Sequence, residues 1–290
     1  MTLHKDMEAV SPADENSSGL TRRSFFRRAT VIGATGAVAL GGLVSLASGL
    51  DQEAASTNHE IDNDSDHLTK GDRDILVAAQ IAEALAVTTY SNIIDIAPFF
   101  SRLPLDDQGY LSAARQEEMS HYLLEQSVTD QFTPYTTFFY PFKMFAHAQT
   151  TLNTLVTLED AFIAAYLVGV RNFSTRRLRV TAARIMGIES DHRTLARVLG
   201  PDVAAHDGGP IEMITGAQGV AESVDPPNNN GYERTLCWTA IEQAVDALLP
   251  FVDATAAKKA GFDTSVSYPF EPFNPTLPSP LGEFISFKGC

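Results

Sequence analysis

Residues 115–124 read RQEEMSHYLL and residues 186–195 read MGIESDHRTL, and these two segments decide the fold. Each contains the pattern Glu-x-x-His, as EMSH in the first segment and ESDH in the second. Residues three apart lie on one face of a helix, so each pattern can present a carboxylate and an imidazole to the same point. The two segments therefore predict two helices that each supply an oxygen ligand and a nitrogen ligand.

Two other segments each place a carboxylate in apolar surroundings. In residues 75–94 the only charged residue is Glu83, and in residues 145–170 the acidic Glu159 and Asp160 have no Lys or Arg nearby. A helix that is apolar nearly all round is buried. A buried carboxylate is costly unless a cation pairs with it. Glu83 and Glu159 are therefore predicted to face a cation.

Four carboxylates and two imidazoles that face one another form the ligand set of a binuclear metal site in a helical bundle. The carboxylates would repel one another in a dry core, but they neutralise two divalent cations. Oxygen and imidazole ligands suit iron or manganese, and they do not distinguish between the two. If the histidines were ordinary core residues and the glutamates surface charges, Glu83 and Glu159 would stay unexplained. The predicted ligands are Glu83, Glu118, His121, Glu159, Glu189 and His192.

The arrangement of apolar segments predicts an all-α four-helix bundle. No segment shows the alternation of period two that indicates a strand. The first two helices and the last two are joined by short connections, which predicts antiparallel pairs. Residues 128–140 are rich in aromatic residues and can span about 40 Å when extended, enough for a long crossover along the bundle. The expected helices cover about 71–100, 106–127, 141–172 and 175–199, the last ending at Gly200-Pro201.

Residues 201–290 are predicted to add a loop, a fifth helix and a tail to the bundle. Residues 201–230 are rich in Gly, Pro and Asn. A fifth helix is expected at about 231–255, with a kink at Pro250. Beyond it, proline recurs at nearly every third position from 269 to 280, which favours an extended, polyproline-like segment. Its aromatic residues suggest that it packs on the bundle, although a strip that binds a partner is an alternative.

The first fifty residues have the pattern of an export signal. Arg22 and Arg23 precede the uncharged residues 29–50, which are rich in Ala, Gly, Val and Leu. The paired arginines resemble a twin-arginine signal, which implies the twin-arginine translocation machinery as a partner, transient membrane contact, and a periplasmic or extracellular location. Residues 29–50 acting as a permanent membrane anchor are the alternative. The acidic residues 51–70 are expected to form a flexible linker.

Composition excludes several classes of protein. The chain has 290 residues, 44% of them hydrophobic and 20% charged, which is ordinary for a packed domain and excludes disorder throughout. The net charge of −15 disfavours nucleic acid, because its phosphates repel an acidic surface. Two cysteines cannot build a disulfide framework, but Cys237 and Cys290 could pair outside the cytoplasm.

The order Glu, Glu-x-x-His, Glu, Glu-x-x-His resembles the ferritin-like superfamily over residues 71–200. The chain looks most similar to exported ferritin-like domain proteins, including desiccation- and stress-related members. The resemblance implies that Glu83 and Glu159 are terminal ligands, that Glu118 and Glu189 bridge two metals, and that His121 and His192 bind one metal each. The added tail argues against a hollow storage cage and leaves the homo-oligomeric state open.

Three residues are predicted to support the ligands. Glu117 stands before a ligand glutamate, where relatives of this kind often place an acid that orients a metal-binding imidazole. The matching position of the other motif holds Ile188. Tyr90 and Tyr166 each follow a ligand glutamate by seven residues, two helical turns along the same face. They either bond to a ligand or relay electrons, or are ordinary core tyrosines.

Three functions are compatible with this sequence. The first is redox chemistry on peroxide, dioxygen or ferrous iron at two metal ions, ferroxidase-like or manganese-catalase-like, in oxidative or desiccation stress. The second is a non-catalytic stress-protection protein in which the metals stabilise the bundle or the site is vestigial. The third is a metal store, which would need more than two ions per chain. A hydroxylase or desaturase is disfavoured, because no feature of the sequence indicates a channel for an organic substrate.

Overall fold

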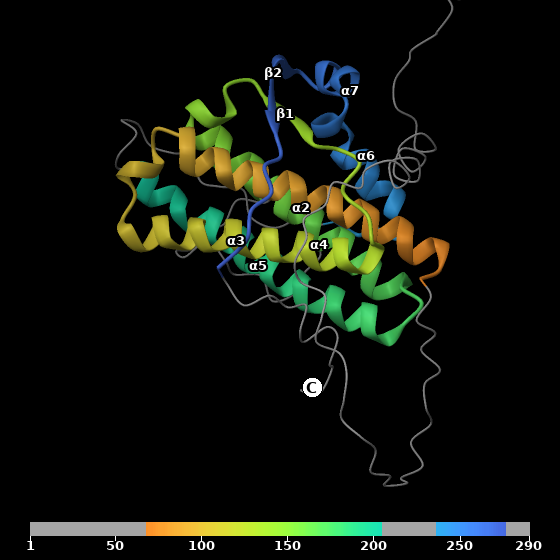
Figure 1. The fold of residues 1–290 in the computed structure, drawn as a ribbon. Helices are drawn as coiled ribbons and strands as arrows, with labels where there is room; N and C mark the ends of the chain where they lie inside the picture. Colours follow the sequence, from red (N-terminus) through yellow and green to blue (C-terminus); the bar gives the residue numbers. More distant parts are fainter. Residues whose placement is uncertain (1–67, 205–235, 277–290) are drawn as a thin grey trace, which may run out of the picture.

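The apolar segments of the chain form four long helices that pack side by side (Figure 1). The computed structural model describes residues 68–204 and 236–276. In chain order the elements are α2 (Lys70–Ile96), η2 (Phe100–Arg102), α3 (Leu105–Thr129), β1 (Thr137–Pro141), η3 (Met144–Ala146), α4 (Ala148–Asn172), α5 (Arg176–Ala204), α6 (Ile241–Val252), α7 (Ala254–Lys259) and β2 (Phe262–Pro269).

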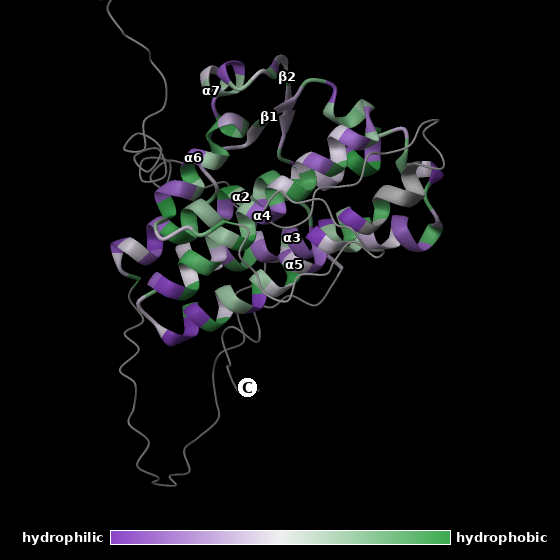
Figure 2. Cartoon of the chain, turned by 180° about the vertical axis from the view of Figure 1, so that it is seen from behind, coloured by the Kyte–Doolittle hydropathy of each residue, from purple (hydrophilic) through white to green (hydrophobic). Residues whose placement is uncertain are grey.

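Helix α2 packs mainly on α3, and α4 packs mainly on α5, as the short connections predict. Contacts between α2 and α4 join the two pairs into one four-helix bundle. Figure 2 shows hydrophobic and hydrophilic residues alternating around the helices, as in helices with one buried face. The four-helix bundle predicted from the sequence is therefore confirmed.

One hydrogen-bonded cluster joins three ends of the bundle. The Thr69 hydroxyl accepts from the Asp72 backbone N–H at 3.1 Å, and the Thr69 N–H donates to Asp72 Oδ2 at 3.0 Å, which caps the start of α2. Asp72 Oδ1 also accepts from the backbone N–H of Ser174, in the turn between α4 and α5, at 2.8 Å. Arg73 donates to the carbonyl of Thr129 at the end of α3, at 3.0 Å. These contacts fix the spacing of the helices at this end.

Three predicted helix boundaries were wrong. The first helix ends at Ile96 and not at 100, because Ala97, which precedes Pro98, has an extended backbone. The third helix starts at Ala148 and not at 141, because Pro141 ends β1 and Lys143 adopts a positive φ of 55° that no helix accommodates. Helix α5 continues to Ala204, past the pair Gly200-Pro201 at which an end was predicted. A proline removes one helical hydrogen bond, and a helix can continue beyond it.

The prediction that the chain contains no strands was also wrong. β1, in the crossover between α3 and α4, pairs antiparallel with β2 near the end of the described chain, with Thr137 opposite Pro269 and Tyr140 opposite Asp263. In β1 the side chains of Phe138 and Tyr140 are buried and their neighbours are less so. This alternation covers only five residues, which is too short to stand out in the sequence.

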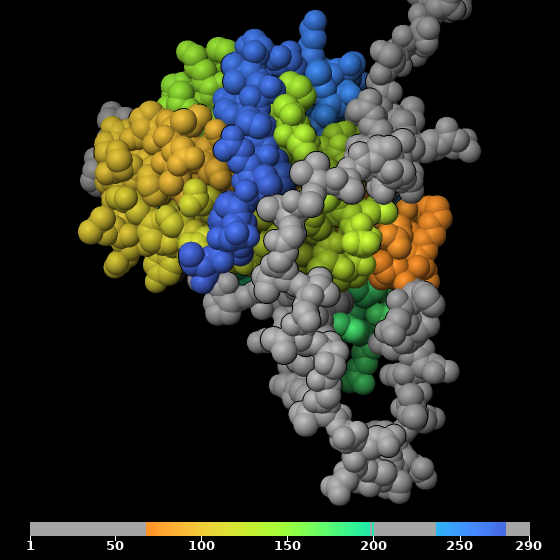
Figure 3. All heavy atoms as spheres, in the orientation of Figure 1, coloured from red at the N-terminus to blue at the C-terminus, as the bar shows by residue number. Residues whose placement is uncertain are grey.

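The tail, which we define as residues 262–276, runs from the sheet across the face of α3 (Figure 3). Phe270 is buried against the ring of Tyr122 in α3, with ring centroids 4.8 Å apart. Further along, the backbone N–H of Thr276 donates to Gln116 Oε1 at 2.7 Å, and residues 270–276 form no regular element. Apolar packing and hydrogen bonds therefore fasten the tail to the bundle.

The predicted fifth helix is shorter than expected. It is α6, which contains Pro250 and is followed at once by the short helix α7. Tyr140 is fully buried between the bundle and these additions. Its hydroxyl lies 3.0 Å from Thr89 Oγ1 in α2, and its ring packs on Phe251 of α6 and Tyr268 of β2. The linker and signal predicted before residue 68, and most of the loop predicted at 201–230, lie outside the described residues.

Candidate metal centre

The six side chains predicted to bind metal meet in the interior of the bundle. Glu83 comes from α2, Glu159 from α4, and the two Glu-x-x-His pairs come from α3 and α5. None of the six residues is more than 6% exposed. Their helices place them here because the apolar neighbours on each helix face the same core.

The six residues form two overlapping groups. In each group one ligand atom per residue lies within 4.8 Å of the others. Glu118 and Glu189 belong to both groups. The first group is Glu83, Glu118, His121 and Glu189, and the second is Glu118, Glu159, Glu189 and His192.

Each shared carboxylate directs one oxygen to each imidazole. His121 Nδ1 lies 3.5 Å from Glu118 Oε2 and 3.3 Å from Glu189 Oε1. His192 Nδ1 lies 2.8 Å from Glu118 Oε1 and 3.5 Å from Glu189 Oε2. The two carboxylates thus stand between the histidines, and Nδ1 is the inward nitrogen of both rings.

The polar atoms at the centre lack ordinary partners. Within the part of the chain that the structure describes, these eight buried atoms have no hydrogen-bond partner: Glu83 Oε2, Glu118 Oε1 and Oε2, His121 Nδ1, Glu159 Oε2, Glu189 Oε1 and Oε2, and His192 Nδ1. Buried polar groups are almost always hydrogen-bonded, so such a concentration requires an explanation. All eight atoms are carboxylate oxygens or imidazole nitrogens, which can bind a metal cation through a lone pair. The residues present therefore fit a pair of divalent metal ions.

In the metal-free protein, bound protons neutralise part of the negative charge of these carboxylates. Burial, together with the charges of Glu118 and Glu189, raises the pKa of the Glu83 carboxyl well above its usual range. Burial and the charge of Glu118 do the same to the pKa of Glu159. For the two histidines, burial alone would lower the pKa, but the surrounding carboxylates raise it well above the usual value. Burial would also raise the pKa of Glu118, but the charge of the neighbouring His192 imidazole lowers it.

The two tyrosines bond to the terminal carboxylates across the bundle. The Tyr90 hydroxyl of α2 donates to Glu159 Oε1 of α4 at 2.8 Å. The Tyr166 hydroxyl of α4 contacts Glu83 Oε1 of α2 in the same way. Burial raises the pKa of both phenols well above the usual range, so both remain neutral donors. The tyrosine of α2 thus contacts the glutamate of α4, and the tyrosine of α4 contacts the glutamate of α2. These reciprocal contacts relate the two helix pairs by an approximate two-fold symmetry.

Glu117 contacts the outer nitrogen of one imidazole. Glu117 Oε2 lies 2.8 Å from His192 Nε2, and this hydrogen bond lowers the pKa of the Glu117 carboxyl. A proton held on Nε2 by this contact leaves the lone pair of Nδ1 facing the centre. Ile188, the equivalent residue on α5, offers no such group to His121, so the two halves of the centre differ here.

Glu125 is a fifth buried carboxylate that the sequence reasoning missed. It lies on α3, seven residues after Glu118 and four after His121, so helical spacing alone could have found it. Its Oε1 lies 2.8 Å from the Tyr166 hydroxyl, and its Oε2 is buried without a partner. Burial raises the pKa of its carboxyl well above the usual range. The symmetry-equivalent residue on α5 is Ala196, so only the half of the centre that contains Glu83 has this additional carboxylate.

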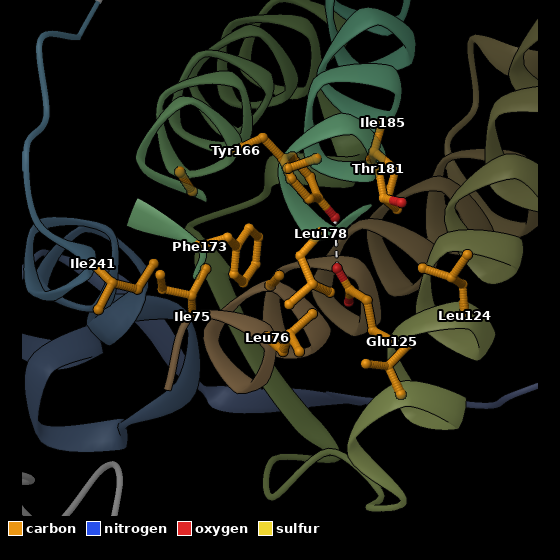
Figure 4. Close-up of a pocket in the computed structure, with 14 residues that line it drawn as sticks. Ile75, Leu76, Leu124, Glu125, Tyr166, Phe173, Leu178, Thr181, Ile185 and Ile241 are labelled. Carbon is orange, nitrogen blue, oxygen red and sulfur yellow. Dashed lines mark hydrogen bonds between the residues drawn. The ribbon is translucent and has the colours of Figure 1, made fainter. Parts of the chain in front are cut away.

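The contacts of Tyr166 require an additional proton. Its hydroxyl carries one hydrogen, yet it lies within hydrogen-bond distance of both Glu83 and Glu125. One of the two carboxyls must therefore carry a proton. Glu125, which lies in the wall of an apolar pocket, is the better candidate, because Glu83 faces the other ligands (Figure 4).

Replacing Glu117 by glutamine should weaken metal binding by about 10–100-fold, because the imidazole of His192 loses its charged partner. The measurement is a competition titration against a chelator with Mn²⁺. Glu242→Gln, on α6 and away from the centre, is the matched control and should bind like the unmodified chain. Equal affinity in Glu117→Gln would show that the contact does not orient the ligand.

Other predicted features lie apart from this centre. The arginine pair Arg22-Arg23 and Cys290 are outside the described residues, so the export signal and the disulfide stay predictions. Cys237 is exposed, just before α6.

Comparison with known proteins gives one match. The model of the ferritin-like domain family matches residues 71–200, which contain all six predicted ligands. No curated protein and no solved structure matches the chain.

Proposed function

Residues 71–200 belong to the ferritin-like domain family, and from this premise we propose that they hold a binuclear iron or manganese centre that reacts with a small oxidant. The observation that carries the proposal is the sharing of Glu118 and Glu189 by both groups of ligand atoms. Two separate metal sites would not need common residues. Two carboxylates that each direct one oxygen to each half are the arrangement that bridges a pair of cations.

In this proposal each half of the centre has one terminal carboxylate and one imidazole. Glu83 and His121 would bind one ion, Glu159 and His192 would bind the other, and Glu118 and Glu189 would bridge them. The hydroxyls of Tyr90 and Tyr166 would support the centre without binding metal, because each donates to an oxygen of a terminal carboxylate and limits the rotation of that carboxylate.

When bound, two iron or two manganese ions would each exchange one electron, which matches a two-electron oxidant such as dioxygen or peroxide. The chain itself excludes water, since all six candidate ligands are buried. A dry site strengthens every charge interaction at the centre and protects reactive species from side reactions. Glu117 holds the proton of His192 on Nε2, so that Nδ1 remains available at the centre.

The alternative is a protein in which the metals only stabilise the bundle. Four carboxylates and two imidazoles placed in a core destabilise the fold unless cations bind, so metal binding of either kind adds to folding stability. The two functions differ in whether the metal-loaded protein turns over peroxide, dioxygen or ferrous iron.

The cellular role in this proposal is protection against oxidative or desiccation stress outside the cytoplasm. The location rests on the arginine pair Arg22-Arg23 and the apolar stretch that follows, and the stress role rests on the resemblance to stress-related ferritin-like proteins. The twin-arginine machinery would then move the chain after it has folded. The oligomer that forms there would be smaller than a storage cage, because the tail covers part of α3.

The test is turnover by the full chain loaded without oxygen with Fe²⁺ or Mn²⁺. We expect two ions per chain, and ferrous oxidation or peroxide decomposition at least about 100-fold faster than with the same concentration of free metal. Glu242→Gln should behave like the unmodified chain. Two bound ions with no rate above that of free metal would support the non-catalytic alternative, and no bound metal would overturn both.

A further inference from the structure

A pocket lies between the four helices on the Glu83 side of the centre, near the start of α6 (Figure 4). Its cavity volume is about 20 Å³. A cavity needs roughly 10–15 Å³ to hold one water, and an apolar cavity of roughly 150 Å³ admits benzene. The pocket therefore suits a molecule of two or three atoms and is too small for an organic substrate.

The wall of this pocket is almost wholly apolar. Eleven of its fourteen lining residues are aliphatic or phenylalanine, and the polar ones are Glu125, Tyr166 and Thr181. Of these, only Glu125 has a buried atom without a partner, its Oε2. A water in a protein interior needs two to four polar partners, and apolar cavities stay dry. The pocket therefore offers poor sites for water.

The inner wall of the pocket is connected to the metal centre. Tyr166 lines the pocket and its hydroxyl contacts Glu83. Figure 4 shows Tyr166 and Glu125 pointing toward each other, with Leu178 beside them and Ile241 at the far end. One side chain thus separates the pocket from a predicted ligand. The other half of the centre has Ala196 in place of Glu125 and cannot form the same wall.

We propose that this pocket binds dioxygen and holds it next to Tyr166, on the Glu83 side of the centre. The inference rests on the proposed function, because dioxygen is then the oxidant that this site receives. Peroxide fits the pocket poorly. Glu125 Oε2 could pair with one of its two hydroxyls, but the other would lose its hydrogen bonds to water, at about 1–3 kcal/mol. Dioxygen has no such groups to satisfy.

The first experiment uses dioxygen as its own probe, on the full metal-free chain. Dissolved dioxygen is paramagnetic and speeds the relaxation of nearby methyl groups. We expect the methyls of Leu124, Leu178 and Ile185 to relax at least threefold faster under oxygen than those of Ile93 and Leu111, which are also buried but do not line the pocket. Equal effects at both sets would overturn the proposal, whether or not the loaded protein turns over.

The second experiment fills the pocket. Ala79→Leu and Ala165→Leu each add volume to its wall from a different helix, so at least one folded variant is expected. In a folded variant that retains two metals, the KM for dioxygen should rise at least fivefold, while the KM for peroxide stays unchanged. An unchanged KM for dioxygen would overturn the proposal. Oxygen in the pocket without any turnover would instead contradict the proposed function and leave the pocket assignment intact.

Discussion

Replacing Glu118 by glutamine should remove both metal ions from the centre, whereas replacing Glu83 by glutamine should remove one. Glu118 belongs to both groups of ligand atoms, and Glu83 belongs to one. Glutamine has nearly the same shape as glutamate, so the bundle should stay folded. Its amide nitrogen offers no lone pair, and the lost charge weakens binding of each neighbouring cation. Turnover should disappear in both variants, since the reaction needs two ions.

The measurement is elemental analysis of purified variants, expressed as ions per chain. We expect two ions in the unmodified chain and in Glu242→Gln, one in Glu83→Gln, and fewer than about 0.2 in Glu118→Gln, which corresponds to binding at least about 100-fold weaker. Two ions retained in Glu118→Gln would show that the carboxylate does not bridge. The metal-free form of Glu118→Gln should be less stable than the unmodified chain, because the lowered pKa of Glu118 marks a carboxylate that pairs favourably with the two imidazoles in the metal-free fold.

The second large effect is the stabilisation of the fold by metal. A ligand present at 100 times its Kd adds about 2.7 kcal/mol to the free energy of unfolding, so two ions add about 5 kcal/mol. For a domain of this size, that corresponds to a rise in Tm of roughly 10–20 °C. Scanning calorimetry with and without Mn²⁺ measures it. A shift below about 3 °C would show that the buried cluster does not depend on cations.

The effect of metal should depend on pH. The raised pKa values of Glu83, Glu159, His121 and His192 mean that the folded, metal-free protein holds protons that the unfolded chain releases. The stability of the metal-free protein therefore falls as the pH rises above about 4.5 for the carboxyls and about 6.5 for the imidazoles. The raised pKa of Glu125 acts in the same sense, while Glu118 and Glu117, whose pKa values are lowered, act in the opposite sense; at this centre they are two groups against five.

Metal replaces those protons, so the loaded protein should not lose stability over the same range. We therefore expect the difference in Tm between loaded and metal-free protein to grow from pH 5 to pH 8. A metal-free Tm that is constant or rises over this range would contradict the assignment of the protons. Glu118→Gln should show no metal-dependent shift at either pH.

The sequence predicted both the bundle and the placement of the six candidate ligands, because the helix faces that pack together are the faces that carry these residues. A carboxylate in an otherwise apolar helix, such as Glu83, is visible without any structure. The repeated spacing of Glu118 with His121 marks a helix face. Once four such helices pack through their apolar faces, the carboxylates and imidazoles that lie on those faces are brought together in the core. The spacing of seven residues placed Tyr90 and Tyr166 on the ligand faces of their helices, but it did not give their partners, because each hydroxyl contacts the glutamate of the other helix.

Other features depend on contacts between distant residues and could not be predicted from local patterns. β1 and β2 pair although α4 to α7 lie between them in the sequence; β1 has only five residues, and β2 is mostly exposed and shows no alternating burial. The start of α4 depends on Lys143, whose positive φ no residue preference announces. Glu125 was overlooked because its helix also carries several other acids and amides, so it does not stand alone as Glu83 does.

The pairing of β1 with β2 has a consequence for biosynthesis. The last candidate ligand, His192, leaves the ribosome well before Pro269, which pairs with Thr137 to complete the sheet. At about 5–20 residues per second, the 77 residues between them take roughly 4–15 s to synthesise. During that interval the four helices can already assemble, with the face of α3 that the tail later covers still open. A metal ion that binds during this interval would therefore enter the bundle before the C-terminal segment packs on α3.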